Sequence, residues 1–180
     1  MKNIICLSGK QYSGKDTAAE MLLKEFKDFK RIGIADAIKI EFGRRNNLTY
    51  KEIELNKGIY RSGLIELGNE GRKINPDFWL DKIIESNSNV IVPDVRLIHE
   101  AEVFKKAGAI LIRVTASAEI RNKRGIVTNK EDLTETELDN YGGFDYYLDN
   151  NGSLEELKEN IMPLILFIKN KITPHLQNSL

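Results

Sequence analysis

Short apolar runs alternate with longer amphipathic segments along the whole chain. Strands are predicted where a short run rich in β-branched residues is bounded by turn residues, at 3–7, 31–34, 90–92, 109–114 and 144–148. Helices are predicted where apolar positions recur every three to four residues, at 14–28, from 36 onward, and at 49–73, 75–86, 97–107 and 153–168. This alternation predicts an α/β fold with a five-stranded parallel sheet and right-handed crossovers. Ligands of such sheets bind outside the carboxyl ends of the strands, so the loops at those ends form the candidate site.

Polar residues and a proline mark where several of these helices begin. Asp36 is predicted to cap the second helix, and Pro76 suits the first turn of the helix at 75–86. Ser153 and Glu156 have the spacing of a capping box at the start of the last helix. The segment between the second and third strands is therefore predicted to be helical.

Composition narrows the possible classes of function. The 180 residues contain no linker-like stretch, which predicts one domain over 1–180. The 27 basic residues balance 27 acidic ones and show no aromatic-basic pattern, so nucleic acid is not an expected partner. A single cysteine excludes an internal disulfide and a cysteine-rich zinc site. Since no apolar run approaches the ~20 residues of a membrane span, we expect a cytoplasmic protein without a membrane partner.

The loop after the first strand has the pattern of a phosphate-binding loop. Gly9 and Gly14 are separated by four residues, and Lys15 follows at the start of an amphipathic helix. Glycines let backbone amides approach phosphate oxygens, and the helix start adds unpaired N–H groups and its dipole. Lys15 adds a full positive charge. The loop predicts ATP binding by Gly9, Ser13, Gly14, Lys15, Asp16 and Thr17.

Two aspartates are candidate ligands for Mg²⁺. Asp16 stands where the motif expects Ser or Thr, and its carboxylate can coordinate Mg²⁺ directly or through water. An unneutralised carboxylate there would also repel phosphate, and Thr17 can supply a hydroxyl instead. Asp94 follows the third strand, where phosphate-transfer enzymes place an acidic residue that holds the water shell of magnesium.

Further cations occur in the helical segment and at strand ends. Asp36 and Lys39 follow the second strand, and Arg61 and Arg72 are spaced so that they share one face of a helix. Arginine binds phosphate with two parallel hydrogen bonds, although any one of these residues alone could be a solvated surface cation. Together with Arg96 they predict an acceptor that is itself phosphorylated, bound by a helical insert at about 36–86.

A lid is predicted at about 116–130, after the fourth strand. Arg121 and Arg124 lie in this segment. Arginines on a closing flap would exclude water and neutralise charge on the phosphoryl group in transfer, which gives both a catalytic role. The acidic stretch 131–159 is predicted to be a solvated face.

At this point the chain resembles a known group of kinases. The Gly9–Thr17 loop, the strand end Pro93–Arg96 and the turn at Asn150–Leu154 are similar to those of the phage-type deoxynucleoside monophosphate kinases. So are Ala35–Lys39, Tyr60-Arg61 with Gly68 and Arg72, Asn75–Trp79 and Glu100. The animal-type phosphomevalonate kinases share much of this pattern, and Leu138–Asp145 is particularly similar to theirs. The resemblance spans residues 3 to about 168.

The resemblance implies a three-layer P-loop NTPase fold of the nucleoside monophosphate kinase type. It implies that Lys15 holds the phosphoryl group in transfer and that Asp16 and Asp94 bind Mg²⁺. Lys39, Arg61, Arg72 and Arg96 would bind the acceptor, and Arg121 and Arg124 would be lid cations. The Asn150–Gly152 turn, with Asn151, would contact the adenine.

Three functions remain open on this basis. The first is ATP- and Mg²⁺-dependent phosphorylation of a (deoxy)nucleoside monophosphate, and the second is the same reaction on phosphomevalonate. The third, from another class, is a non-catalytic nucleotide-binding switch. The lid arginines and Asp94 argue against the switch, because a sensor needs no acceptor clamp.

Overall fold

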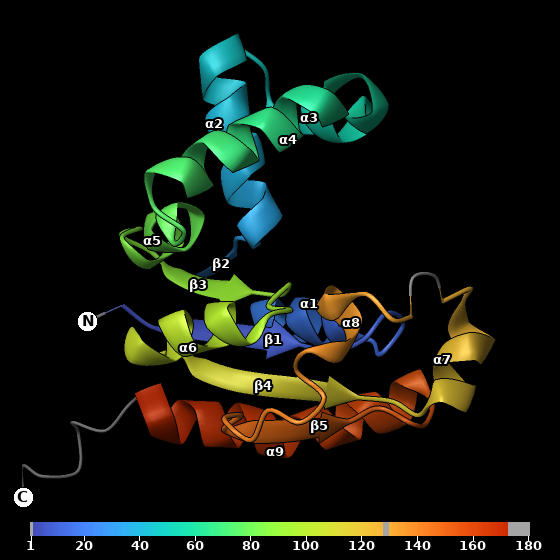
Figure 1. Ribbon diagram of the computed structural model, residues 1–180. Coiled ribbons are helices and arrows are strands. Elements are labelled where there is room, and N and C mark those ends of the chain that lie inside the picture. Colours follow the sequence, from blue (N-terminus) through green and yellow to red (C-terminus); the bar gives the residue numbers. More distant parts are fainter. Residues whose placement is uncertain (1, 128–129, 173–180) are drawn as a thin grey trace, which may run out of the picture. The chain divides into compact units, whose positions relative to one another are not determined.

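Five parallel strands form one sheet in the order β2-β3-β1-β4-β5 (Figure 1). The strands are β1 (Ile4–Ser8), β2 (Phe29–Arg31), β3 (Asn89–Val92), β4 (Ile110–Thr115) and β5 (Tyr146–Asp149). Every residue of β1 is buried, and Cys6 pairs with Val92 on one side and Leu111 on the other. The predicted five-stranded parallel sheet is therefore confirmed, with the candidate phosphate loop after its central strand.

This computed structural model describes residues 2–127 and 130–172, which fall into two compact units. Unit 1 comprises Met1–Arg31 and Ser88–Leu180, and unit 2 comprises Ile32–Asn87. Unit 2 encloses the segment for which the acceptor insert is predicted.

The sheet of unit 1 lies between two layers of helices. The helices are α1 (Lys15–Glu25), α6 (Ile98–Lys106), α7 (Ala118–Arg124), α8 (Leu133–Thr136) and α9 (Leu154–Ile172). Helices α1 and α9 pack against each other, with Leu22, Ile161 and Leu164 in one apolar core, while α6 packs against β1 and β4. Burial of these apolar side chains supplies most of the stabilisation of the unit. No helix in the described ranges combines the length and the apolar character needed to cross a bilayer.

Unit 2 is built from four helices: α2 (Ile34–Asn46), α3 (Tyr50–Leu55), α4 (Lys57–Ile74) and α5 (Phe78–Ile84). Trp79 of α5 is 2% exposed, and its Nε1 donates a 3.0 Å hydrogen bond to the carbonyl oxygen of Gly68 in α4. A Cβ on Gly71 would lie 2.6 Å from Trp79 Nε1, so the glycine permits the close approach of the indole. The unit therefore has a small core of its own.

The second strand differs from the one predicted. A strand was predicted at 31–34, but β2 covers Phe29–Arg31 and Ile34 already begins α2. Gly33 is the residue before the helix, and Asp36 lies in its first turn, where its Oδ2 accepts a 2.9 Å hydrogen bond from Gly33 N–H. Asp36 thus completes a capping box in place of being the cap itself.

Several helix boundaries also differ from the pattern. The helix predicted at 49–73 is divided at Asn56 into α3 and α4, and α5 begins at Phe78, so Pro76 lies ahead of the helix. Helix α8 was not predicted, because four residues are too few to show helical periodicity.

Candidate active site

The phosphate loop connects β1 to α1, and two glycines determine its shape. Gly14 has φ 90° and ψ 16°, a left-handed conformation that L side chains rarely adopt. A Cβ on Gly14 would lie 2.1 Å from Asn150 Nδ2, and a Cβ on Gly9 would lie 2.7 Å from the carbonyl oxygen of Val114. The loop therefore leaves no room for a side chain at either glycine.

The other predicted loop residues surround this turn. Lys15 is the first residue of α1 and is 8% exposed, while Asp16 is exposed and Thr17 is half-buried. The Ser13 hydroxyl is buried and has no hydrogen-bond partner among the described residues. A buried hydroxyl without a partner and a buried lysine beside a glycine turn fit a phosphate group.

Arg31, the last residue of β2, balances the charge of Asp16. Its Nη2 lies 3.2 Å from Asp16 Oδ1, and Lys15 Nζ lies 3.7 Å from Asp16 Oδ2. Two cations thus offset the carboxylate that would otherwise repel phosphate. Arg31 was not predicted as a site residue, because the strand was predicted to begin there and the partner of its side chain lies in another element.

Asp94 follows β3 and is half-buried next to a second carboxyl group. Burial raises the pKa of Glu100, and the charge of Asp94 raises it further. Hydrogen bonds from the backbone N–H groups of Arg96 (2.8 Å) and Leu97 (3.1 Å) oppose this rise. Negative charge therefore gathers where β3 ends, as expected of a place that attracts a cation.

Asp16 and Asp94 fit a magnesium ion that is held largely by phosphates. In the part of the chain that the structure describes, no group of three or more His, Cys, Asp and Glu could hold a metal by itself. Mg²⁺ typically takes one or two carboxylates, with substrate phosphates and water as its other ligands. Asp16 in the first turn of α1 and Asp94 after β3, both in unit 1, are carboxylates that could serve as such ligands.

Arg124, which lies in the segment predicted to form a lid, contacts the phosphate loop and the turn after β5. Its Nη2 donates to the carbonyl oxygen of Gly152 at 2.9 Å and to Asn150 Oδ1 at 3.4 Å, and its Nη1 donates to the carbonyl oxygen of Tyr12 at 3.5 Å. A Cβ on Gly125 would lie 2.2 Å from the Tyr12 ring, so the glycine lets the end of α7 approach that side chain. Residues 128–129 of the predicted lid lie outside the described residues.

The start of α7 is held by the other two predicted residues. Arg121 Nε donates a 3.3 Å hydrogen bond to the carbonyl oxygen of Ala116. Asn151 Oδ1 accepts a 2.7 Å hydrogen bond from Ser117 N–H. Asn150, which belongs to the turn expected to contact the adenine, contacts the phosphate loop itself, since its Nδ2 donates to the carbonyl oxygen of Ser13 at 2.7 Å.

Residues 132–139, here called the acidic strap, pack against the phosphate loop. Glu135 is 4% exposed. Asp139 pairs with Lys10 at 2.6 Å and with Arg113 at 3.1 Å. Arg96 forms an ion pair of 3.1 Å with Glu135. The prediction of a solvated acidic face holds for Asp132 and Asp139, which are exposed, and was wrong for Glu135, because the groups that pair with it come from elements distant in sequence.

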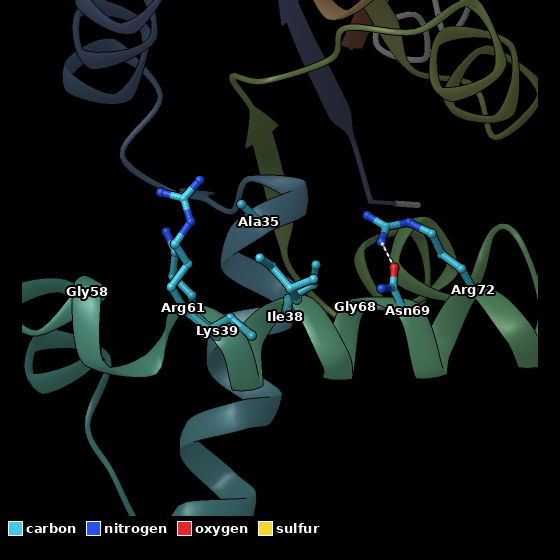
Figure 2. A pocket seen from close by; sticks show the side chains of 10 residues that line it. Ala35, Ile38, Lys39, Gly58, Arg61, Gly68, Asn69 and Arg72 are labelled. Atoms are coloured by element: carbon cyan, nitrogen blue, oxygen red, sulfur yellow. Dashed lines mark hydrogen bonds between the residues drawn. The ribbon is translucent and has the colours of Figure 1, made fainter.

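Unit 2 contains a pocket of about 400 Å³ that is lined by three of the predicted acceptor residues, Lys39, Arg61 and Arg72 (Figure 2). Figure 2 shows Arg61 and Arg72 pointing to the same side of α4. The remaining lining is largely apolar and includes Ile38, Leu64 and Ile65. Asn69 is a polar side chain in this lining. Within residues 2–127 and 130–172, neither arginine forms an ion pair with a carboxylate, and Arg72 makes one long hydrogen bond of 3.4 Å to Asn69 Oδ1.

The charge of Lys39, in contrast, is neutralised. Its Nζ lies 3.0 Å from Asp36 Oδ1 and 2.7 Å from Glu54 Oε1. Burial alone would lower the pKa of Lys39, but these two partners raise it. Burial would raise the pKa of Asp36, but hydrogen bonds from Tyr50, Gly33 N–H and Lys39 lower it. The pocket is thus left with two arginines whose charge is available to an anion.

The structure brings the predicted residues together in two places. Gly9, Ser13, Gly14, Lys15, Asp16, Thr17, Asp94, Arg96, Arg121, Arg124 and Asn151 belong to unit 1, and Asp36, Lys39, Arg61 and Arg72 belong to unit 2. Arg31 and Glu135 were missed, because each is defined by a partner in another element of the chain.

A phosphate loop after the central strand of a parallel sheet, with a buried lysine at the start of the next helix, is the arrangement of a P-loop kinase, and comparison with known families shows the same class. The sequence model of the phosphomevalonate kinase family matches residues 7–109, and that of the deoxynucleotide monophosphate kinase family matches residues 72–161. The chain therefore belongs to the P-loop kinase group that these two families form. It is an ATP-dependent kinase that transfers a phosphoryl group to a small-molecule acceptor.

Solved structures with the same fold include kinases of other acceptors. Shikimate kinase from Aquifex aeolicus vf5 is 18% identical with a TM-score of 0.51, over 94% of this chain and 99% of that one. A gluconokinase from Sinorhizobium meliloti 1021 is 15% identical with a TM-score of 0.55, over 95% of each chain. Shikimate kinase from Acinetobacter baumannii, in complex with shikimate, is 18% identical with a TM-score of 0.54, over 94% and 96%. At such identities the similarity concerns the fold alone.

Proposed function

We propose that the acceptor carries a phosphate group and that it is a (deoxy)nucleoside monophosphate, which the enzyme converts to the diphosphate. The observation that carries the proposal is the pair Arg61 and Arg72, which line one pocket without a carboxylate partner in the described parts of the chain. Two guanidinium groups that are free of carboxylates suit a dianionic phosphate. The side-chain amide of Asn69 in the same lining can donate to and accept from a base edge.

In the proposed mechanism the chain binds and orients two substrates, the triphosphate of ATP and the phosphate of the acceptor. The amides of the phosphate loop and the Lys15 ammonium hold the triphosphate, and the lid arginines Arg121 and Arg124 neutralise charge during transfer. Asp16 and Asp94 would hold Mg²⁺, which when bound offsets negative charge on the phosphates.

The acceptor phosphate needs no general base, because its second pKa near 6 leaves it ionised at neutral pH. One of its oxygens attacks the γ-phosphorus. The bond from that phosphorus to the bridging oxygen breaks, and the electron pair leaves with ADP. The acceptor phosphate must reach the γ-phosphate at Lys15, which is the step that Arg61, Arg72 and Arg96 serve, whereas the charge of Lys39 is neutralised by Asp36 and Glu54.

Phosphomevalonate is the second candidate acceptor. The match to the phosphomevalonate kinase family spans every residue that lines the pocket, and Ile38, Leu64 and Ile65 offer aliphatic contacts that suit a branched, non-aromatic body. Either acceptor would present its phosphate to the same arginines.

A panel of acceptors with ADP release as the readout tests the proposal. It comprises the deoxy- and ribonucleoside monophosphates and phosphomevalonate, with the corresponding nucleosides, mevalonate, shikimate and gluconate as acceptors without phosphate. We expect turnover of at least one nucleoside monophosphate and none of the unphosphorylated compounds. Activity on phosphomevalonate alone would replace the first acceptor by the second, and activity on hydroxyl acceptors alone would refute the phosphate-acceptor class.

Two substitutions locate the acceptor site. Arg61→Ala and Arg72→Ala are each expected to raise the KM for the acceptor by about tenfold or more, as for a lost charge-assisted hydrogen bond, while the KM for ATP changes little. Arg44→Ala, an exposed arginine of α2 outside the pocket, is the matched control. An acceptor KM that stays at the wild-type value in both pocket variants would move the acceptor elsewhere.

A further inference from the structure

The acidic strap contains one buried carboxylate, Glu135, and the mechanism above gives it no role. Glu135 is 4% exposed, whereas Asp132 and Asp139 at the two ends of the strap are exposed. A carboxylate loses favourable hydration on burial, and its loss is compensated only when its oxygens are paired. The partners of Glu135 therefore indicate what it does.

Each carboxylate oxygen of Glu135 accepts a hydrogen bond from a residue of the candidate active site. Oε2 accepts a 2.9 Å hydrogen bond from the backbone N–H of Gln11 in the phosphate loop. Oε1 accepts a 3.1 Å hydrogen bond from Arg96 Nη1. Glu135 thus bridges the phosphate loop and the segment after β3, which also carries Asp94.

The strap itself is held at further points, so Glu135 has a defined position. Asp139 Oδ2 accepts from Lys10 Nζ at 2.6 Å, and Asp139 Oδ1 accepts from Arg113 Nη2 at 3.1 Å. Glu137 Oε1 accepts from the backbone N–H of Ile98 at 3.2 Å. Contacts on both sides of the phosphate loop hold the strap against it.

The backbone and the side chain of Arg96 are held by different groups. The Arg96 N–H donates to Glu100 Oε2 at 2.8 Å, while its guanidinium is paired with Glu135. An arginine side chain samples many rotamers in solution, and a charge-assisted hydrogen bond to a fixed carboxylate selects one of them. Without Glu135 the position of the guanidinium would not be determined by the contacts that the structure describes.

We infer that Glu135 is a positioning residue for phosphoryl transfer. It holds the Arg96 guanidinium and the backbone of the phosphate loop at Gln11 in fixed positions relative to each other. The Arg96 guanidinium is then already oriented when the acceptor phosphate binds, and the phosphate loop keeps its shape around the triphosphate. Small displacements of a positioned group are costly to catalysis, which is why a residue that touches neither substrate can matter. The inference rests on the proposed role of Arg96 toward the acceptor.

Glu135→Gln tests the inference, because it keeps the size of the side chain and removes its charge. A glutamine has one accepting oxygen, and its amide N–H₂ cannot accept from either donor, so one of the two bonds is lost. We expect kcat/KM for the acceptor to fall by about 10- to 100-fold, as for other residues that orient a site group. The Kd of ADP, measured by calorimetry without acceptor, should change by less than about threefold, because Lys15 and the remaining loop amides still bind phosphate. Glu137→Gln, a substitution of the same kind in the same strap, should keep the activity of the wild type, because the hydrogen bond that Glu137 accepts from Ile98 N–H can still be accepted by the amide oxygen of glutamine.

A double-mutant cycle with Arg96→Ala separates positioning from general stabilisation. If Glu135 acts through Arg96, the double variant has the kcat/KM of Arg96→Ala alone. Losses that multiply, or equal effects of Glu135→Gln and Glu137→Gln, would overturn the inference. Glu135→Asp keeps the charge but is shorter by one methylene, so an intermediate loss is expected, and full activity in that variant would also overturn it. The Asp variant decides the question if Glu135→Gln does not fold.

An NMR measurement separates this inference from the proposed function, because it needs no acceptor. The side-chain Nε–H signal of Arg96, assigned by its absence in Arg96→Ala, is expected to shift and broaden in Glu135→Gln and to stay unchanged in Glu137→Gln. An unchanged signal in Glu135→Gln refutes the positioning role. A perturbed signal together with an acceptor panel that shows no turnover refutes only the proposed acceptor.

Discussion

The side-chain amide of Asn150 donates a 2.7 Å hydrogen bond to the backbone carbonyl oxygen of Ser13, across 137 residues of the chain. Asn150 directly follows β5, and Ser13 precedes the left-handed Gly14. The same asparagine accepts a hydrogen bond from the lid residue Arg124 at 3.4 Å. One buried amide thus joins the phosphate loop, the last strand and helix α7 of unit 1.

Loss of this amide should weaken both the fold and nucleotide binding. Asn150→Ala leaves the buried carbonyl of Ser13 without its partner, which costs about 1–3 kcal/mol of unfolding free energy. We expect a lower urea midpoint and a weaker Kd for ADP, because the loop amides lose their support. Asn160→Ala, which removes a longer and exposed hydrogen bond of 3.3 Å to the carbonyl of Asp149, is the control. Equal ADP affinity in the wild type and Asn150→Ala would mean that the loop holds its shape without the asparagine.

Gly14→Ala is predicted to abolish nucleotide binding. Alanine would have to adopt φ 90°, a conformation that L residues rarely take, and its Cβ would lie 2.1 Å from Asn150 Nδ2. The loop or the asparagine must therefore move. Calorimetric titration with ADP should then show no heat, although the chain remains folded by circular dichroism. Gly142→Ala is the matched control, because a Cβ there meets nothing within 4 Å. Tight ADP binding by Gly14→Ala would contradict the assignment of this loop to phosphate.

Lys15→Ala is predicted to lower turnover by orders of magnitude and to leave the fold intact. The ammonium is a single charge that no neighbour can replace at the phosphoryl group. Steady-state kinetics with the best acceptor of the panel measures the loss, and the thermal midpoint checks the fold. Lys24→Ala, an exposed lysine in the last turn of the same helix, should behave as the wild type. Kinase activity preserved in Lys15→Ala would contradict the site.

The pH dependence of unit 2 should report on Asp36. Burial would raise the pKa of Asp36, but hydrogen bonds from Tyr50, Gly33 N–H and Lys39 outweigh it and lower the pKa below the ordinary 3.8. A lowered pKa means that the carboxylate stabilises the fold above pH 3.8 and that this contribution is lost as the pH falls through the folded-state value. We therefore expect Asp36→Asn to cost about 1–3 kcal/mol at neutral pH, the range for a hydrogen-bonded charged group, and much less in strong acid.

Fluorescence of the single tryptophan, Trp79, reads the unfolding of unit 2 directly. Glu66→Gln, an exposed carboxylate of α4, is the control for a general effect of charge. A difference between the wild type and Asp36→Asn that is the same at neutral pH and in strong acid would show that the carboxylate charge does not contribute.

The strand and helix pattern and the phosphate loop could be predicted from the sequence, because both depend on residues that are near one another in the chain. β1 is a continuous apolar run, and Gly9, Gly14 and Lys15 have their required spacing within one loop. The predicted ends of helices and strands were wrong where two local sequence signals compete. Ile34 suits a strand by type, but Gly33 and Asp36 form a capping box around it, and the helix prevails.

What the sequence by itself determined is the class of fold, the phosphate loop with Lys15, and the set of cations available to bind an acceptor. Only the tertiary structure decided which charges pair and which remain available. Lys39 is neutralised by Asp36 and Glu54, whereas Arg61 and Arg72 keep their charge for a ligand. The bridge from Glu135 to Gln11 and Arg96 spans 124 residues in one direction and 39 in the other. Pairing depends on distance in space and on burial, and local composition contains neither, so these roles emerge only when the sheet and its loops have assembled.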